Sequence, residues 1–174
     1  MRTSSRHHRG EGSPEHRAMD VVCFTIADAE YGIDVGSVLG VNPLMDITPL
    51  PGAPTHVRGI VNVRGRVMPV VGLSERFGVE ESNDGSKRRI VVTRTGNGLA
   101  GIVVDSVTRV ISTTDEDISP PPVDVIGTGY LSGVAQIENA MVLLVDPDAV
   151  TGIENLRINP TDCGGGDESG KTQD

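Results

Sequence analysis

The stretch GIVNVRGRVMPVVGLSERFG, residues 59–78, places two apolar runs on either side of a tight turn. Ile60–Val63 and Val67–Leu73 are rich in β-branched residues, whose restricted χ1 angles suit a pleated strand. Arg64-Gly65-Arg66 lies between the two runs, so the pattern predicts a β-hairpin. Ser74–Phe77 follows as a predicted short helix, closed by a glycine of the kind that commonly comes just after a helix C-terminus.

The same alternation of apolar runs and turns continues on both sides of this hairpin. Ile47–Leu50, closed by prolines, is predicted as a short strand, and Val107–Ile111 as a further strand. Val35, Val38 and Val41 recur at roughly helical spacing, which is compatible with a short helical turn or an irregular strand. Three more hairpins are predicted, from Val21–Ala27 with Tyr31–Val35, Arg89–Arg94 with Leu99–Val104, and Tyr130–Ile137 with Met141–Val145.

The order of these elements repeats within the chain. Residues 32–38 (GIDVGSV) match residues 101–107 (GIVVDSV) at Gly, Ile, Val, Ser and Val. Residues 59–63 (GIVNV) similarly parallel residues 133–137 (GVAQI). Two copies of a five-strand unit are therefore expected. A unit of about 60 residues is marginally stable alone, so we expect the two copies to share a core.

Composition and charge limit the possible functions. Hydrophobic residues make up 37% of the chain but aromatic residues only 2%, so the core must consist mainly of Val, Ile and Leu. Lys and Arg total 15 against 24 Asp and Glu, for a net charge of −9. This charge repels phosphate backbones and disfavours nucleic-acid binding. The acidic, Lys-poor composition is compatible with either a high-salt cytoplasm or GC-biased codon usage.

The two ends of the chain differ from its middle. Residues 1–18 and 161–174 are polar and lack periodicity, so we expect two disordered tails around an ordered domain at residues 19–160. No apolar run reaches the length of a membrane span or resembles a signal peptide, which predicts a cytoplasmic protein without membrane insertion. Cys23 lies in a strand pattern and Cys163 in a tail, so no disulfide framework is expected.

Chemistry for catalysis is missing from the expected ordered region. Catalysis needs a nucleophile, an acid–base pair or a metal held together. His56 and Cys23 have no neighbouring partner of the required kind in the sequence. The acidic run 115–117 would bind Ca²⁺ only if other ligands converged on it, so a solvated loop is expected. We therefore expect neither an enzyme nor a bound cofactor.

Residues 59–78 resemble the signature of the CheW family, which reads roughly G-V-x-N-L-R-G-x-x-x-P-V-x-D-L. The likeness extends to three other stretches: residues 24–41 (FTIADAEYGIDVGSVLGV), 46–59 (DITPLPGAPTHVRG) and 101–110 (GIVVDSVTRV). Val63 replaces the usual Leu of the signature, Gly72 stands where Asp is common, and Ser74 where a basic residue is common.

The resemblance implies an all-β fold of two intertwined five-stranded SH3-like β-barrels around a shared hydrophobic core, with short helices. It also implies a non-catalytic chemotaxis adaptor, located in the cytoplasm and recruited to membrane-associated chemoreceptor arrays. The implied partners are the regulatory domain of the CheA histidine kinase and the cytoplasmic tips of methyl-accepting receptors.

Three sets of residues follow from the resemblance. The implied receptor-binding residues are Arg64, Val35, Val38, Val41, Val104 and Val107. The implied kinase-binding residues are Ile47, Thr48, Leu50, Val57 and Arg58. Gly59, Asn62 and Gly65 are expected to shape the backbone of the motif. The alternatives are plain core packing for each valine and a local salt bridge for Arg64.

Two other classes of protein remain as rival hypotheses. An oligonucleotide-binding β-barrel is disfavoured by the acidic charge and by the scarcity of aromatic side chains for base stacking. An enzyme with a site dispersed along the chain is the second rival, and a bound metal would be its simplest indication.

Overall fold

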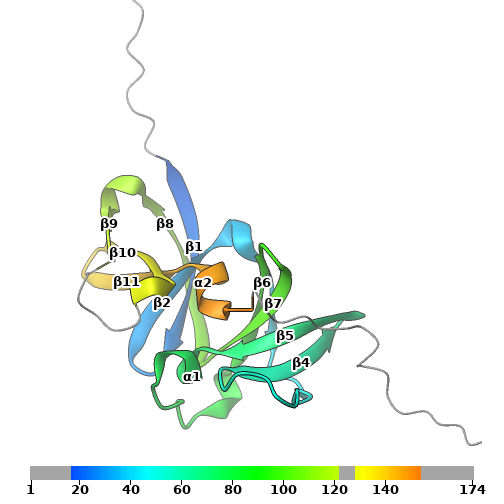
Figure 1. Ribbon diagram of the computed structural model, residues 1–174. Coiled ribbons are helices and arrows are strands. Elements are labelled where there is room, and N and C mark those ends of the chain that lie inside the picture. Colours follow the sequence, from blue (N-terminus) through cyan, green and yellow to red (C-terminus); the bar gives the residue numbers. More distant parts are fainter. Residues whose placement is uncertain (1–16, 122–127, 154–174) are drawn as a thin grey trace, which may run out of the picture.

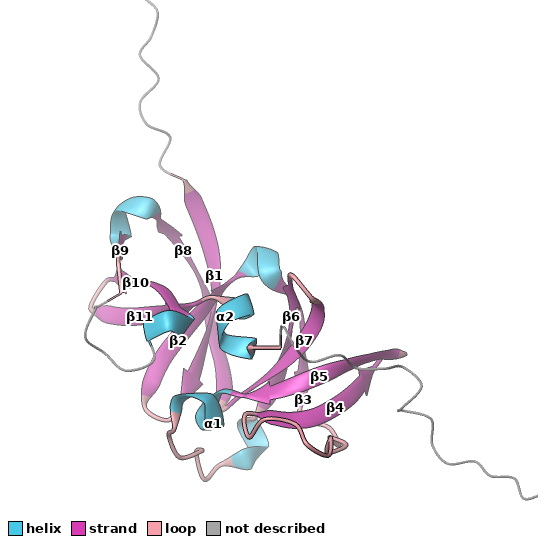
Figure 2. Cartoon of the chain, in the orientation of Figure 1, coloured by secondary structure: helices cyan, strands magenta, loops and turns pink. Residues whose placement is uncertain are grey.

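The computed structural model describes residues 17–121 and 128–153, and strands dominate it (Figures 1 and 2). The predicted tails, apart from residues 17 and 18, and Cys163 lie outside the described residues. The strands are β1 (Ala18–Ile26), β2 (Ala29–Asp34), β3 (Val38–Pro43), β4 (Val57–Val63), β5 (Arg66–Gly72), β6 (Arg89–Thr95), β7 (Gly98–Val104), β8 (Ser106–Thr114), β9 (Ile118–Ser119), β10 (Leu131–Ile137) and β11 (Ala140–Val145).

The helical elements are short. The described residues contain two α-helices, α1 (Leu73–Phe77) and α2 (Pro147–Thr151). The 3₁₀ turns are η1 (Val35–Ser37), η2 (Gly85–Lys87), η3 (Asp115–Asp117) and η4 (Thr128–Tyr130). Among the described residues, no helix is both long enough and apolar enough to cross a membrane.

The described strands form two sheets. The first has the order β8-β1-β2-β11-β10-β9 and the second has the order β3-β6-β7-β5-β4. Neighbouring strands are antiparallel, except that β11 runs parallel to β2 and β5 runs parallel to β7. We call these sheets, with their helices, the first barrel and the second barrel. This architecture confirms the predicted fold of two intertwined SH3-like barrels, with a sixth, two-residue strand in the first barrel.

The two sequence repeats exchange strands rather than closing separately. The first hairpin of each repeat pairs with the third strand of the other repeat. In the first barrel β8 pairs with β1 of the β1–β2 hairpin, and in the second barrel β3 pairs with β6 of the β6–β7 hairpin. The last hairpins are exchanged in the same way, since β11 lies beside β2 and β5 beside β7. Neither repeat therefore closes a barrel from its own strands alone.

The prediction of a strand at Ile47–Leu50 is wrong. Only a single bridge forms there. The backbone N–H of Thr48 donates to the carbonyl of Ile60 at 2.9 Å, and the carbonyl of Thr48 accepts from the N–H of Ile60 at 2.8 Å. Pro49 follows at once and has no N–H to donate, so the ladder cannot extend. Its counterpart in the second repeat, β9, reaches two residues and pairs with β10.

One hydrophobic cluster belongs to both barrels. Its buried members come from β1, β2, β6, β7, β11 and the two α-helices: Val22, Phe24, Ile26, Ile33, Leu73, Val91, Ile102, Val104, Val145 and Val150. Two smaller clusters fill the individual barrels, one around Cys23 and Val142 and the other around Met68 and Ile90. The predicted shared core is therefore present, and Cys23 is fully buried within the first barrel.

All four aromatic residues of the chain stack in one row beside this core. The ring centroids of Phe24 and Tyr31 lie 6.1 Å apart, those of Tyr31 and Phe77 5.0 Å, and those of Phe77 and Tyr130 6.0 Å. Phe77 belongs to α1, which follows the last hairpin of the second barrel, whereas the other three rings belong to the first barrel. The row therefore ties the two barrels together through an aromatic contact on each side of Phe77.

Gly32 lies where β2 passes closest to its neighbours. A Cβ atom there would overlap Cγ1 of Val21 and lie 2.9 Å from Cγ1 of Val142. Gly101, at the matching place in the second repeat, would meet Cγ2 of Ile90 at 2.8 Å. The matched glycines therefore mark equivalent places of close strand packing in the two barrels.

We predict that Gly32→Ala lowers the free energy of unfolding by about 1–3 kcal/mol, because the added methyl forces Val21 and Val142 apart. Urea denaturation measures the change. Gly129→Ala is the matched control, since nothing lies within 4 Å of the Cβ position at Gly129. Equal unfolding midpoints for the two variants would contradict the assigned packing.

Candidate functional site

The β4–β5 hairpin carries the sequence motif and has a tight tip. Arg64 has a φ of 53° and Gly65 a φ of 83°, both in the left-handed region. The side-chain oxygen of Asn62 accepts a hydrogen bond of 2.8 Å from the N–H of Gly65. This bond closes the turn, and Arg64 stays exposed at its tip. Ala27 in the β1–β2 turn and Glu138 in the β10–β11 turn have φ values of 53° and 54°, so this conformation belongs to the tight hairpin turn.

Gly59 lies near the start of β4, at the end of the hairpin away from the turn. Its φ is 147°, and a Cβ atom there would overlap the carbonyl of Thr48. The two backbone hydrogen bonds between Thr48 and Ile60 require this close approach. Gly59 and Asn62 thus shape the two ends of β4.

A pocket of about 370 Å³ opens between β3 and the tip of the β4–β5 hairpin. Its lining comes from five strands and the hairpin turn of the second barrel: Leu39, Gly40, Val41, Asn42, Val63, Arg64, Arg66, Met68, Val92 and Leu99. We call it the hairpin pocket. It brings together two predicted receptor-binding residues, Arg64 from the hairpin turn and Val41 from β3. Val41 and Leu39 have 42% and 45% of their surface exposed.

The other predicted receptor-binding residues lie outside the hairpin pocket. Val35 is exposed on η1, whereas Val38 and Val107 are half-buried against the shared core. Val104 is 0% exposed, in the middle of that core. A side chain with no solvent-exposed surface cannot contact a partner. Val104 therefore packs in the core, and we no longer assign it to the receptor-binding residues.

Of the predicted kinase-binding residues, Thr48 lines a second hollow of about 440 Å³, which is formed by the β4–β5 hairpin and the segment before it. Thr48 is exposed there, with Ile60 and Asn62 also in the lining. Ile47 and Leu50 are half-buried beside it, and Val57 is buried at 7% exposure. Because the sheet ends at β4, this face also presents an edge strand.

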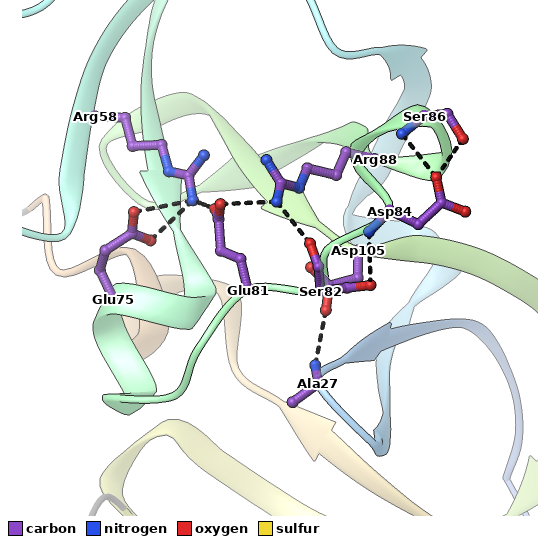
Figure 3. A network of polar contacts seen from close by, with 9 residues as sticks. All are labelled: Ala27, Arg58, Glu75, Glu81, Ser82, Asp84, Ser86, Arg88 and Asp105. Carbon is purple, nitrogen blue, oxygen red and sulfur yellow. Dashed lines mark hydrogen bonds and ion pairs between the residues drawn. The ribbon is translucent and has the colours of Figure 1, made fainter.

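Arg58 is held in a network of ion pairs (Figure 3). Its guanidinium lies 2.9 Å from Oε1 of Glu75 on α1 and also contacts Glu81. Glu81 pairs in turn with Arg88 at 3.0 Å, and Arg88 donates to the carbonyl of Ser82 at 2.8 Å. Arg58 therefore joins β4 to α1 and to the segment around Glu81, which lies between the two repeats. Its positive charge is paired with the two glutamates of the same chain.

Arg76 on α1 connects the second barrel to the first. Its guanidinium lies 4.5 Å from the ring centroid of Tyr130 and donates to the carbonyl of Ala149 at 3.4 Å. A second nitrogen lies 3.5 Å from Nδ1 of His56, whose Nε2 lies 3.2 Å from the carbonyl of Thr151. Burial, and next the charge of Arg76, lower the pKa of His56 from its ordinary value of 6.5.

We predict that acid weakens the connection that Arg76 and His56 make between the two barrels. The folded state favours neutral His56 more strongly than the unfolded chain does, because protonated His56 would face Arg76. The stabilisation is therefore complete above pH 6.5 and is lost as the pH falls toward the lowered pKa. Urea unfolding of the wild type and His56→Gln between pH 8 and 5.5 measures the effect. The wild type should lose more stability than the variant, and parallel curves would contradict the role of His56.

Sequence reasoning missed several residues of these sites. Leu39 and Arg66 line the hairpin pocket. The alternation of exposed and half-buried residues along β3 could have indicated Leu39. The position of Arg66 beside the hairpin turn could have indicated Arg66. The contact of Arg76 with Tyr130 had no local signal, because it depends on the exchange of hairpins between the barrels. Within the described residues, no group of His, Cys, Asp and Glu is arranged to hold a metal ion.

The fold defines a two-barrel SH3-like protein. The family model of the CheW-like domain matches residues 20–154. The chain is 31% identical to the chemotaxis protein CheW of Rhizobium meliloti (strain 1021), over 75% of this chain and 86% of that protein. It is 30% identical to the CheW of Treponema pallidum (strain Nichols), over 80% and 86%.

A solved structure agrees with these matches. The scaffolding protein TtCheW from Thermoanaerobacter tengcongensis superposes with a TM-score of 0.73 at 30% identity, covering 77% of this chain and 92% of that one. The chain therefore belongs to the CheW-like domain family, and it is a chemotaxis coupling adaptor.

Proposed function

We propose that this chain is a non-catalytic adaptor that binds the cytoplasmic tips of methyl-accepting receptors and the regulatory domain of the CheA kinase. It acts in the cytoplasm at receptor arrays. The observation that carries the receptor part is the hairpin pocket, which joins exposed aliphatic side chains on β3 to Arg64 at the hairpin tip. Receptor tips are helical, and a groove lined by aliphatic residues accepts the apolar face of a helix.

The kinase part of the proposal rests on the opposite side of the β4–β5 hairpin. The hollow that contains Thr48 lies beside β4, the last strand of its sheet, whose outer edge is bridged by Thr48 at Ile60 and carries no further strand among the described residues. An edge strand with apolar neighbours suits pairing with another barrel, such as the homologous regulatory domain of the kinase. Ile47, Thr48 and Leu50 are the proposed contact residues. Val57 and Arg58 support this face from within, because one is buried and the other is ion-paired.

Two binary binding experiments test the proposal. The chain should co-migrate on size-exclusion chromatography with the CheA regulatory domain and with a receptor cytoplasmic fragment at micromolar concentrations. Arg64→Ala should weaken receptor binding about tenfold or more and leave kinase binding and the unfolding midpoint unchanged, since Arg64 is exposed and removed from the core.

Lys87→Ala is the matched control, because Lys87 is an exposed cation outside both hollows. Absence of co-migration with either folded partner would contradict the adaptor function. A loss of stability in Arg64→Ala would assign Arg64 a structural role instead.

A further inference from the structure

Three arginines surround the mouth of the hairpin pocket. Arg64 and Arg66 line it from the β4–β5 hairpin, and both are exposed. Arg94 is exposed on β6, two residues from Val92 of the pocket lining, so these two side chains lie on the same face of the sheet. Arg94 also pairs directly across the strands with Leu99, another lining residue. We call Arg64, Arg66 and Arg94 the cationic rim.

The cationic rim has no ionic partner within the described part of the chain. No carboxylate lines the hairpin pocket, and no ion pair joins any of the three arginines to another described residue. In contrast, the cations that do form ion pairs with carboxylates are Arg58, Lys87, Arg88 and Arg109. On a chain of net charge −9, a group of three cations without ionic partners attracts acidic groups.

The chain leaves the described structure on the same barrel. Ile153 is 5% exposed and packs against Val57 and Val71. Val71 lies five residues from Arg66 along β5, which is about 17 Å at the rise of an extended strand. The segment that follows Ile153 therefore begins on the strand that carries part of the cationic rim.

Residues 154–174 supply the acidic charge that the cationic rim attracts. They contain five carboxylate side chains against two cations. Asp162, Asp167 and Glu168 lie on either side of the glycines at residues 164–166. A Gly-rich chain of 14 residues, the separation of Asp167 from Ile153, has a root-mean-square reach of about 20 Å. This reach matches the distance to the rim, and such a tether gives an effective concentration on the order of 1 mM.

We infer that the acidic stretch at residues 162–168 docks on the cationic rim and covers the mouth of the hairpin pocket. Its carboxylates pair with Arg64 and Arg66, because a guanidinium group holds a carboxylate in a planar, bidentate pair. The bond from the N–H of Gly65 to Asn62 fixes the hairpin turn beforehand, which reduces the entropy lost on docking. The docked stretch competes with any partner for the pocket. The docking itself needs no partner, whereas its effect on receptor binding rests on the proposed function.

A nitroxide spin label on Cys163 tests the docking in the full-length chain without any partner. Cys163 lies beside Asp162 in the sequence. Cys23 does not take the label, because it is 0% exposed and burial raises the pKa of its thiol to about 11. We expect paramagnetic broadening of the NMR signals of the backbone amides around Arg64 and Arg66, measured against Cys163→Ser treated with the same reagent. Absence of this broadening would overturn the inference.

Charge exchange at the hairpin shows whether the contact is ionic. Arg64→Glu combined with Arg66→Glu should reduce the broadening at least about threefold, and added salt should reduce it in the wild type. Lys87→Glu is the matched control, because Lys87 is an exposed cation outside the hairpin pocket, and it should leave the broadening unchanged. Equal broadening in the wild type and the doubly substituted hairpin would contradict the ionic contact.

The acidic stretch can be changed without altering any described residue. Asp167→Lys combined with Glu168→Lys should abolish the broadening in the wild type and restore it in the chain with Arg64→Glu and Arg66→Glu. Failure of both effects would overturn the inference, even if the substitutions at the hairpin lower stability. A mixture of spin-labelled chains with isotope-enriched chains that carry no spin label gives a further control. Broadening in that mixture would assign the docking to a second copy and overturn docking within one chain.

Loss of the acidic charge should open the pocket for a receptor. Asp167→Asn combined with Glu168→Gln should tighten binding of a receptor cytoplasmic fragment about two- to threefold in isothermal titration, because a larger fraction of the chains has an open pocket. Lys171→Gln, which changes a charge in the same segment, should not tighten it. Unchanged affinity in the first variant would overturn the competition. Absence of receptor binding by every chain would contradict the proposed function, whereas the spin label alone decides the docking.

Discussion

The packing of two exchanged strand sets against one core holds this molecule together. Phe24 and Ile33 come from the first barrel, and Val91 and Ile102 from the second, yet all four belong to one buried cluster. Removing either barrel would expose the other half of that cluster to water, at about 25 cal/mol for each Å² of apolar surface. Neither repeat has enough strands of its own to avoid this, because each gives its third strand and its last hairpin to the other.

The exchange also places the hairpin pocket on a barrel built from both halves of the chain. The hairpin pocket lies on a barrel whose β3 and β5 come from the first repeat and whose β6 and β7 come from the second. The aromatic row and the contact between Arg76 and Tyr130 then fix α1 against the first barrel. A partner bound at the hairpin tip therefore meets a surface whose position depends on both halves of the chain. This suits an adaptor, which must hold two partners in a constant relative placement.

Much of the secondary structure and of the core could be predicted from the sequence. The β-branched runs separated by turns indicated most of the strands, whereas β3 was left open between a helical turn and an irregular strand. The matched Gly32 and Gly101 proved to be equivalent close approaches. The exchange between repeats could not be read from the residues alone, because periodicity specifies that a strand forms and not which strand it pairs with. It followed only from the family resemblance.

The site could be predicted in part, and the misses have physical causes. Val104 fits the same pattern as Val35, but it lies at the centre of the exchanged core, where the repeat equivalence no longer implies equal exposure. Helix α2 was missed although Asp146 accepts bonds from the N–H groups of Asp148 and Ala149 and Gly152 ends the helix in the left-handed region. A five-residue helix gives too short a pattern to be recognised against the preceding strand.

The central claim is that the shared core makes the two barrels one cooperative unit. Native-state hydrogen exchange, followed by NMR in increasing urea, tests it most directly. The slowest amides of β1 and β11 in the first barrel, and of β6 and β7 in the second, should exchange with the same free energy and the same urea dependence. If one barrel opens at markedly lower free energy while the amides of the other stay protected, the barrels are separate folding units and the account of the exchanged core is wrong.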